Sequence, residues 1–490
     1  MLLPLFEDLP RKLLVLFLVL GLAGCTSAGG PRSGGLAIAG ATIVDVVAGG
    51  LVEGKTVVVE GKKITGILGG PPPAHLRVID GRGKFLIPGL WDMHVHLFNH
   101  NRRAGTTNEE AHFRLYTANG VTRVRDMWSV PAEIAMARQW QQKVEAGAAI
   151  GPYVYPSSSI IDGSPVFFEP GVAGSVLSVK NEAEARQAVR DMKAAGADFV
   201  KVYWTLSPEA YRAIADESRQ AGLPFAGHVP FLISAFEASE SGQATIEHLT
   251  GILETCSSRE EELRFAEWSE AIDAAMFASF DREKCRRLFK TFASNGTWNV
   301  PTLVLHRGLA LHDQPHVAKN PDLDYLAPQM VAEWSSSPQI DRAHDEKARQ
   351  RFRLLLDLVA DLAAAGAGLM AGTDNNNPYV VPGFALHDEM ALFVEAGLSP
   401  AAALRAATID PARFMKLDGE TGSIEAGKAA DIVLLDANPL EDIRNTRKIH
   451  AVLRNGTYFD RQALDTMLAE AAEIERQRDK EWLGEKPNGN

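Results

Sequence analysis

Two histidines, His94 and His96, stand two residues apart in the apolar run 90–97. In a β-strand, side chains at positions i and i+2 point to the same face, so both imidazoles can reach one site. Imidazole nitrogens are ligands for zinc and similar divalent ions. An HxH triplet alone is weak support, because a chain with 13 histidines among 490 residues contains one by chance about one time in three.

Further residues with ligand chemistry follow, each within or at the end of its own β-rich run: Lys201, His228, His248 and Asp374. In a barrel of parallel strands the carboxyl ends of the strands converge on the active site. One histidine in a strand is often structural, whereas four histidines and an aspartate at converging positions are hard to explain by packing alone. We therefore predict a metal site built from His94, His96, Lys201, His228, His248 and Asp374.

The elements that must position these residues form a repeating pattern. Helical segments separate most of eight β-rich runs, which are 90–97, 121–127, 153–160, 198–204, 224–230, 244–249, 297–305 and 368–374. Residues 184–196 and 207–222 are expected helices, the second with Ser207 as N-cap and Pro208 at the first helical position. Alternating strands and helices indicate an α/β protein with a parallel sheet, and eight such units favour a (β/α)8 TIM barrel over residues 89–415.

Both ends of the chain differ from this middle part. Residues 37–88 and 416–460 contain short β-branched runs broken by Gly and Asp, which predict a small β-sandwich assembled from both ends of the chain. Residues 461–490 read as a charged, amphipathic C-terminal helix on the surface.

The first residues have the features of an export signal. Arg11 and Lys12 precede an apolar run that ends at Cys25 and is too short to span a bilayer comfortably. Leu22-Ala23-Gly24-Cys25 resembles a bacterial lipobox, so we expect a lipoprotein signal peptide over 1–25, lipidation of Cys25 and a flexible tether over 26–36. The protein is then exported and lipid-anchored, at the outer membrane facing the periplasm. The alternative is a plain signal peptide with an incidental Cys.

Composition narrows the classes of function. Hydrophobic residues make up 46% of the chain and charged residues 23%, which suits a globular core. A net charge of -12 argues against nucleic acid as a partner, because such proteins need a positive surface. After Cys25, only Cys256 and Cys285 remain, and a disulfide or two core thiols are equally compatible with the sequence.

Taken in order, MHVH at 93–96, the strand-borne Lys201, and GHVP, IEHL and GTD further along resemble the amidohydrolase superfamily. The nearest likeness is to the imidazolonepropionase-like and prolidase-like branch, which includes Xaa-Pro and other dipeptidases and ochratoxin-type amide hydrolases. It covers nearly the whole chain, through residues 422–436. The resemblance implies a metal-dependent hydrolase that cleaves an amide or peptide bond of a small substrate, such as a dipeptide, an Xaa-Pro-like compound or an N-acyl amino acid.

The resemblance also implies roles for the ligands. His94 and His96 hold the more buried of two divalent ions, for which Zn²⁺ is the expected metal, and His228 and His248 hold the second. Asp374 is both a ligand and the general base that later returns the proton to the leaving amine. A free ammonium has no lone pair for a metal, so Lys201 is expected as a carbamate that bridges the ions. If Lys201 is an unmodified lysine, a single ion is expected.

Other residues receive weaker predictions. Tyr203 shares a strand face with Lys201 and is a candidate to stabilise the oxyanion, or a plain barrel-wall residue. His306 is a weaker candidate for a substrate contact, and a surface histidine is the favoured interpretation. Arg125 and Asp126 are expected to form a structural ion pair, with a substrate contact as the alternative. The loop 162–171 is expected to act as a lid or an oligomer contact. Residues 375–377, three asparagines, shape the pocket or only a turn.

Three alternatives to amide hydrolysis stay open. The metal ligands do not separate an amidase from a deaminase or a cyclic-amide hydrolase on the same scaffold. A catalytically silent binding lipoprotein is a third reading, although a binding module needs no such set of ligands. Oligomers are common in this superfamily, so a homo-oligomer is compatible with the sequence, without a number of subunits.

Overall fold

The computed structural model describes residues 35–98, 109–167, 175–266, 269–334 and 346–482. The predicted signal peptide, Cys25 and nearly all of the tether lie outside these ranges, as do the last residues of the predicted C-terminal helix. Within the described ranges, no helix combines the length and apolarity that crossing a membrane requires.

A parallel sheet of eight strands forms the middle of the molecule, and each of the eight predicted runs contributes one strand. The strands are β6 (Leu90–Val95), β7 (Val121–Asp126), β8 (Tyr153–Asp162), β10 (Phe199–Val202), β11 (Phe225–Gly227), β12 (Thr245–Glu247), β13 (Trp298–Val300) and β14 (Gly368–Leu369). They pair in chain order from β6 to β14, with every pairing parallel. A ninth, unpredicted strand, β9 (Val176–Ser178), pairs with β8.

The two ends of this strand order meet. Met93 donates a backbone hydrogen bond to the carbonyl of Ala371 at 2.9 Å, and the Asp374 N–H donates to the His94 carbonyl at 2.7 Å. The first strand therefore contacts the segment that follows the last one. A curled parallel sheet whose first and last members touch in this way fits a (β/α)8 barrel.

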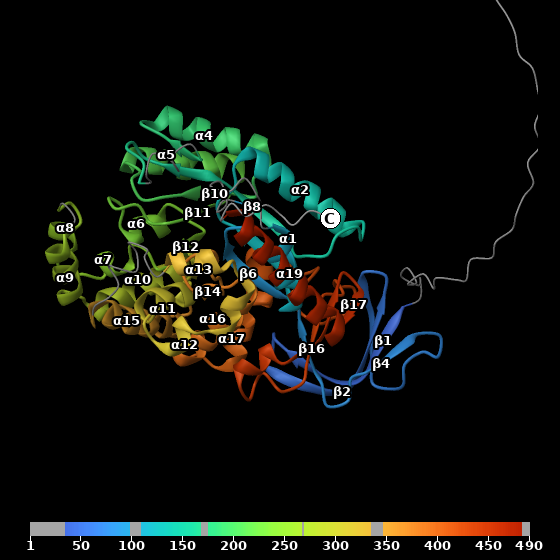
Figure 1. Ribbon diagram of the computed structural model, residues 1–490. Helices are drawn as coiled ribbons and strands as arrows, with labels where there is room; N and C mark the ends of the chain where they lie inside the picture. Colours follow the sequence, from blue (N-terminus) through green and yellow to red (C-terminus); the bar gives the residue numbers. More distant parts are fainter. Residues whose placement is uncertain (1–34, 99–108, 168–174, 267–268, 335–345, 483–490) are drawn as a thin grey trace, which may run out of the picture.

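Helices cover the outside of the barrel sheet (Figure 1). Those before β12 are α1 (Glu109–Ala118), α2 (Pro131–Glu145), α4 (Glu182–Ala195), α5 (Pro208–Ala221) and α6 (Ala235–Glu240). Those between β12 and β14 are α7 (Ile252–Thr255), α8 (Glu260–Leu263), α9 (Glu270–Ala278), α10 (Arg282–Asn295), α11 (Leu303–Ala310), α12 (Pro315–Ala318), η1 (Pro321–Tyr325), α13 (Pro328–Trp334) and α15 (Glu346–Ala364). Later helices are α16 (Phe384–Glu395), α17 (Pro400–Ala406), α18 (Ile409–Phe414), η2 (Ile443–Arg447) and α19 (Arg461–Trp482).

Helix α5 begins as its sequence predicts. The Ser207 hydroxyl accepts a hydrogen bond from the Ala210 N–H at 3.2 Å, and Pro208 occupies the first helical position. Gly222 ends the helix in the left-handed conformation that glycine tolerates. The predicted charged helix is α19, which packs against α1.

The prediction of one long strand over 297–305 is wrong in its second half. The strand β13 stops at Val300, Thr302 has a left-handed φ of 49°, and α11 begins at Leu303. Pro301 has no N–H for a sheet ladder, so the strand cannot continue through it. The apolar residues that follow are buried on a helix rather than a strand, a distinction that a short apolar run does not reveal.

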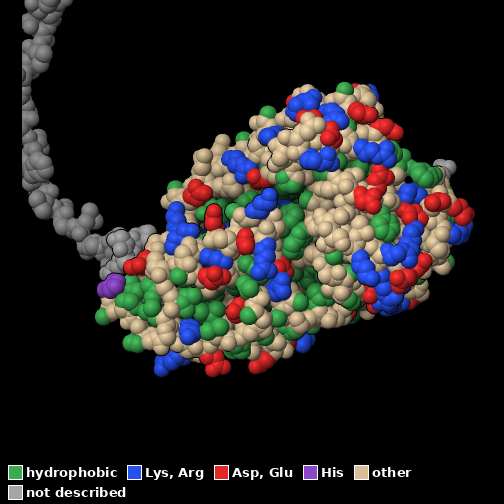
Figure 2. Space-filling view, turned by 180° about the vertical axis from the view of Figure 1, so that it is seen from behind, with side chains coloured by type: hydrophobic (Ala, Val, Ile, Leu, Met, Phe, Trp, Pro, Cys, Tyr) green, Lys and Arg blue, Asp and Glu red, His purple; other side chains and the backbone are tan. Residues whose placement is uncertain are grey.

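Both ends of the chain join in a second sheet. Its strands are β1 (Leu36–Asp45), β2 (Gly50–Glu60), β3 (Lys63–Leu68), β4 (Arg77–Asp80), β5 (Phe85–Pro88), β15 (Ile432–Leu435), β16 (Ile449–Arg454) and β17 (Thr457–Asp460). The antiparallel pairing of β5 with β15 connects the N-terminal strands to the C-terminal ones. Side chains from one face, among them Ile38, Val57 and Ile432, share a core of their own. Figure 2 shows hydrophobic side chains gathered on the surface of this part of the molecule.

A buried cluster of charged residues connects this sheet to the barrel. Asp431, just before β15, accepts hydrogen bonds from Arg123 of β7 at 2.6 Å and from Arg454 of β16 at 2.9 Å. Burial raises the pKa of Asp431, but the two guanidinium groups outweigh it and hold that pKa at about 2. The carboxylate is therefore ionised and paired at neutral pH.

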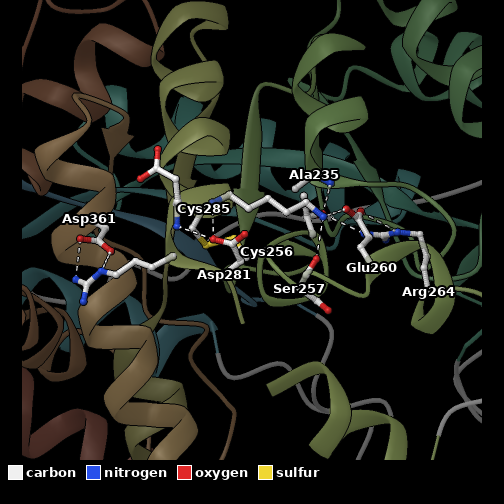
Figure 3. The surroundings of a disulfide bond; sticks show 12 residues. Ala235, Cys256, Ser257, Glu260, Arg264, Asp281, Cys285 and Asp361 are labelled. Carbon is white, nitrogen blue, oxygen red and sulfur yellow. Dashed lines mark hydrogen bonds and ion pairs between the residues drawn. A yellow bond between two sulfur atoms is a disulfide. The ribbon is translucent and has the colours of Figure 1, made fainter. Parts of the chain in front are cut away.

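A disulfide joins Cys256 and Cys285, which resolves the choice that the sequence left open. It links the end of α7 to α10, and Figure 3 shows the polar contacts around it. Lys284 and Arg264 both pair with Glu260, at 2.6 Å and 2.5 Å. The long segment between β12 and β13 is thus stabilised by a disulfide and by ion pairs.

Candidate active site

A cavity of about 580 Å³ opens among the barrel residues that end or follow the strands. All eight residues predicted as ligands or substrate contacts line it: His94, His96, Lys201, Tyr203, His228, His248, His306 and Asp374. The structure thus brings together side chains that the sequence placed on five separate strand runs, with His306 directly after a sixth. This position matches the carboxyl ends of the strands, where barrel enzymes bind their substrates.

His94, His96 and Asp374 form the tightest group in the cavity. Asp374 Oδ1 lies 2.8 Å from His96 Nε2 and 3.3 Å from His94 Nε2. One ligand atom from each of the three residues lies within 4.8 Å of the others, and all three residues are buried. This spacing brings two imidazole nitrogens and a carboxylate oxygen to one point.

A hydrogen-bond network fixes the backbone around this group. Asp92, buried on β6, accepts from the Thr373 N–H at 3.0 Å and from the Thr373 hydroxyl at 2.6 Å. The Asn375 side chain accepts from the His96 N–H at 2.9 Å, and the Asn376 amide donates to the His96 carbonyl at 2.7 Å. The asparagines therefore bind the strand that carries the histidines. Asp374 itself has a left-handed φ of 58°, a strained conformation that persists only where its surroundings fix it.

Glu247 orients His94, and sequence reasoning missed it. The His94 Nδ1–H donates to Glu247 Oε2 at 2.8 Å, so Nε2 faces Asp374 and the cavity. Arg125 donates to Glu247 Oε1 at 2.7 Å. Burial raises the pKa of Glu247, but Arg125 and His94 outweigh it and hold that pKa well below its usual range. A carboxylate that fixes the tautomer of a histidine in this way is typical of metal sites.

The expected ion pair between Arg125 and Asp126 is wrong. Arg125 extends into the barrel, where it also donates to the Met93 carbonyl at 2.7 Å. Asp126 instead accepts from the Leu97 N–H at 2.7 Å and from the Ser129 hydroxyl. Neighbouring residues in a strand point to opposite faces, so these two side chains cannot meet. The expectation that both are structural residues is consistent with these contacts.

His248 lies beside the first group. Its ring centroid is 4.5 Å from that of His94, and its Nδ1 is 3.8 Å from Asp374 Oδ2. The same Nδ1 is 2.7 Å from the hydroxyl of Thr302. Both His248 and Thr302 have left-handed φ values, 58° and 49°. Two strained residues at the ends of adjacent strands thus hold one another by a hydrogen bond.

Lys201 and His228 complete the floor with fewer contacts. The Lys201 N–H donates to the Ser158 hydroxyl at 2.8 Å, and within the described residues its Nζ makes no hydrogen bond or ion pair. Burial lowers the pKa of Lys201 to about 8. The His228 ring packs on Tyr203 and Trp204, at 4.2 Å and 4.6 Å between centroids, and its buried Nδ1 has no hydrogen-bond partner in the described structure.

This set of donors fits a divalent metal. Burial lowers the pKa of both His228 and His248 well below the usual value, so their rings are neutral and keep a lone pair. His94 directs Nε2 into the cavity for the same use. Neutral imidazoles and an ionised carboxylate around one buried space are the ligands that zinc binds in proteins.

The walls of the cavity differ in character. Near His228 they are aromatic, since Tyr203 and Trp204 line the cavity. Each has a further aromatic neighbour outside the lining: Phe231 stacks on Trp204 at 4.7 Å, and Phe167 lies 5.9 Å from Tyr203 between ring centroids. Of the loop predicted as a lid, residues 168–171 lie outside the described residues, and Phe167 is its last described position. His306, on α11, and Arg351, on α15, also line the cavity.

The chain belongs to the amidohydrolase family, whose model matches residues 85–458. The match spans both the barrel and the return to the second sheet. The protein is therefore a hydrolase that acts on carbon–nitrogen bonds of small molecules, in a family that typically depends on divalent metal.

Individual proteins support this assignment. A candidate prolidase from Bifidobacterium longum superimposes with a TM-score of 0.65 and 27% identity, covering 90% of this chain and 100% of that one. Ochratoxinase from Aspergillus niger is 23% identical over 434 residues, 78% of this chain and 76% of its own length. Adenine deaminase 2 from Jannaschia sp. is 45% identical over only 69 residues, 14% of this chain and 11% of that enzyme.

Proposed function

We propose that this protein hydrolyses the amide or peptide bond of a small substrate, such as a dipeptide, an Xaa-Pro-like compound or an N-acyl amino acid. The observation that carries the proposal is the group of Asp374, His94 and His96 on the floor of the cavity. The likeness to a candidate prolidase over nearly the whole chain supports the substrate class.

Each floor residue has a role in this proposal. His94, His96, His228, His248 and Asp374 would hold two divalent ions, most readily Zn²⁺, and Lys201, if carboxylated, would be a further anionic ligand. Bound in this way, the ions supply Lewis acidity towards the scissile carbonyl and an activated water.

Proton transfer belongs to the chain itself. Asp374 accepts the proton of the attacking water and later donates it to the leaving amine, as general base and then general acid. Tyr203, on the wall beside Lys201, donates its hydroxyl hydrogen to the developing oxyanion. His306, which also lines the cavity, contacts the substrate. The leucines and aromatic rings around the cavity exclude water, which strengthens these contacts.

A panel experiment tests the reaction. Metal-loaded protein is incubated with Xaa-Xaa dipeptides, including Xaa-Pro, and with N-acetyl amino acids, and the released amines are measured. Hydrolysis of members of the panel, lost on chelation and restored by Zn²⁺, is the expected result. Metal analysis should give two ions per chain, and mass spectrometry of the intact protein an extra carboxylate on Lys201. A protein that binds no metal and hydrolyses nothing would be the silent binding protein instead.

The short likeness to adenine deaminase 2 favours deamination as the second candidate. It covers 14% of this chain, whereas the likeness to the candidate prolidase covers 90%. The same panel, extended with adenine and with cyclic amides, separates the candidates, since a deaminase releases ammonia without cleaving the substrate in two.

We also propose that the protein is exported and anchored by a lipid on Cys25, facing the periplasm from the outer membrane. The disulfide between Cys256 and Cys285 supports this, because disulfides persist in oxidising compartments. Labelling of cells with a radioactive fatty acid tests it: Cys25→Ser should lose the label and be released from the membrane fraction. The sheet formed from both ends of the chain is, in this proposal, the predicted β-sandwich next to the anchor.

A further inference from the structure

Two charged side chains on the cavity wall, Arg351 and Glu254, have no role in the proposed hydrolysis, and Arg351 is the cation of the two. Arg351 projects from α15 and lines the cavity, as do the leucines on either side, Leu305 of α11 and Leu355 of α15 itself. With 43% of its side chain exposed, the guanidinium stays solvated at the cavity wall, where an entering anionic group can reach it.

The partner that the chain provides leaves most of the guanidinium available. Nη1 of Arg351 donates to Asp273 Oδ1 of α9 at 2.9 Å, with 43% and 39% of the two side chains exposed. An ion pair this exposed is screened by water and contributes little. A guanidinium has five N–H donors, and among the described residues the others of Arg351 have no hydrogen-bond partner.

The described cavity wall carries one positive and one negative side chain. Apart from Lys201 and Asp374 on the floor, the charged residues lining it are Arg351 and Glu254, the latter on α7. These two groups are not within 4 Å of one another in the described structure, so neither neutralises the other. An anionic substrate group is repelled by Glu254 and attracted by Arg351, which also lies beside the imidazole of His306.

We propose that Arg351 binds the carboxylate of the substrate, so that the enzyme selects amides with a free carboxylate, such as dipeptides and N-acyl amino acids, over neutral amides. Planar guanidinium groups pair with carboxylates through two parallel hydrogen bonds, which gives orientation as well as affinity. A cavity of about 580 Å³ suits ligands of this size. The inference rests on the proposed amide hydrolysis and adds a specificity-determining residue to it.

The test compares matched substrates. Each hydrolysed dipeptide and N-acetyl amino acid is assayed beside its C-terminal carboxamide, which has nearly the same shape without the charge. Wild-type enzyme should have a KM at least about tenfold lower for the acid. Arg351→Gln should remove this preference by raising the KM of the acid, with kcat little changed and the carboxamide unaffected. Arg351→Lys should retain only part of the preference for the acid, since an ammonium group cannot form the two parallel hydrogen bonds of a guanidinium.

Two further variants serve as controls. Arg353→Gln changes an arginine two residues along the same helix that pairs with Glu346 and is 60% exposed, and it should leave both substrates unaffected. Asp273→Asn removes the present partner of Arg351 and should leave the KM of the acid equal or lower. If Arg351 acts only through Asp273 to fix α9 on α15, Asp273→Asn will instead reproduce the loss seen in Arg351→Gln.

A binding measurement separates this inference from the proposed reaction. Titration calorimetry with the Asp374→Asn variant should detect an N-acetyl amino acid but not its carboxamide, and the added Arg351→Gln change should abolish the signal. If the wild-type enzyme hydrolyses no member of the panel, the proposed function fails. If it hydrolyses acid and carboxamide equally well, or if Arg351→Gln affects both alike, amide hydrolysis stands and the role of Arg351 is overturned.

Discussion

The two halves of the cavity floor are built in different ways. On the β6 and β14 side, hydrogen bonds surround His94, His96 and Asp374: His94 donates to Glu247, Thr373 donates to Asp92, and Asn375 and Asn376 bond the backbone of His96. On the β10 and β11 side, Lys201 Nζ and His228 Nδ1 make no hydrogen bond in the described structure, and His228 is held by ring packing.

The protein itself orients the residues of the first half, whereas the residues of the second half need a bound ligand to satisfy their polar atoms. The first half is preorganised, because Glu247 sets the orientation of His94, and hydrogen bonds fix the backbone at His96 and at Thr373, next to Asp374. In the second half, Lys201 Nζ and His228 Nδ1 have no such support among the described residues, and their hydrogen-bonding capacity is unused until something binds there. We therefore expect substitutions in the first half to affect folding as well as metal binding, and those in the second half to affect mainly metal binding.

The largest effect is expected for Asp374→Asn. An amide oxygen can still ligate a metal but cannot take a proton from water, so kcat should fall by about 10³-fold or more. Metal content, measured by atomic emission, should change little. A variant with near wild-type kcat would refute the role of Asp374 as the base.

Glu247→Gln, a change at the residue that supports the first half, should destabilise the protein. It leaves Arg125 buried without its anionic partner, so the free energy of unfolding should decrease by about 3–5 kcal/mol. Metal affinity should also fall about 10- to 100-fold, since His94 loses the carboxylate behind it. Urea denaturation of the metal-free protein measures the first effect.

His228→Asn is the matched change in the second half. In the metal-free protein its unfolding free energy should decrease less than that of Glu247→Gln, because ring packing on Tyr203 and Trp204 is lost but no hydrogen bond to Nδ1 and no partner of a buried charge. Metal content should nevertheless fall. Equal destabilisation by Glu247→Gln and His228→Asn would remove the distinction between the two halves.

The double variant Cys256→Ser, Cys285→Ser tests how much the disulfide stabilises the segment that follows β12. Losing the link between α7 and α10 should lower the unfolding free energy by about 2–4 kcal/mol. Dithiothreitol should reproduce the shift in the wild type and have no effect on the variant. If reduction leaves the melting temperature unchanged, the ion pairs around Glu260 alone stabilise this segment.

Thr302→Val should have the smallest effect. It removes the hydroxyl that bonds His248 Nδ1 and keeps the shape of the side chain, so about 1 kcal/mol of stability should be lost. Metal affinity at the second position should fall about tenfold, while that at the first position should not change. Titration with Zn²⁺ in competition with a chromophoric chelator resolves the two sites.

The sequence predicted the strands and the ligands better than their supports. Each of the eight β-rich runs contains a strand, because strand length and alternation are local properties. The ligands line one cavity because a parallel barrel brings strand ends together whatever the side chains are. The run 297–305 is a strand only as far as Val300, because Pro301 has no N–H for the sheet ladder.

The supporting residues could not be predicted in the same way. Arg125 and Glu247 meet across the barrel interior, on strands that are not neighbours, and only the closed fold makes them adjacent. A signal was available: each is a charged residue on a buried strand, facing the same way as an apolar or small neighbour two positions away. Thr302 offered no such signal, since its contact with His248 depends on left-handed backbone at both residues.

The sheet shared by the two ends of the chain has a consequence for how the protein folds. The partner of β5 is β15, which is synthesised only after the whole barrel. Until then β5 presents an unpaired edge, the kind of surface that recruits other chains. Contacts this distant in sequence form slowly. The N-terminal strands can therefore complete their sheet only when β15 has been synthesised. Until then, keeping these strands unfolded would protect the chain from aggregation.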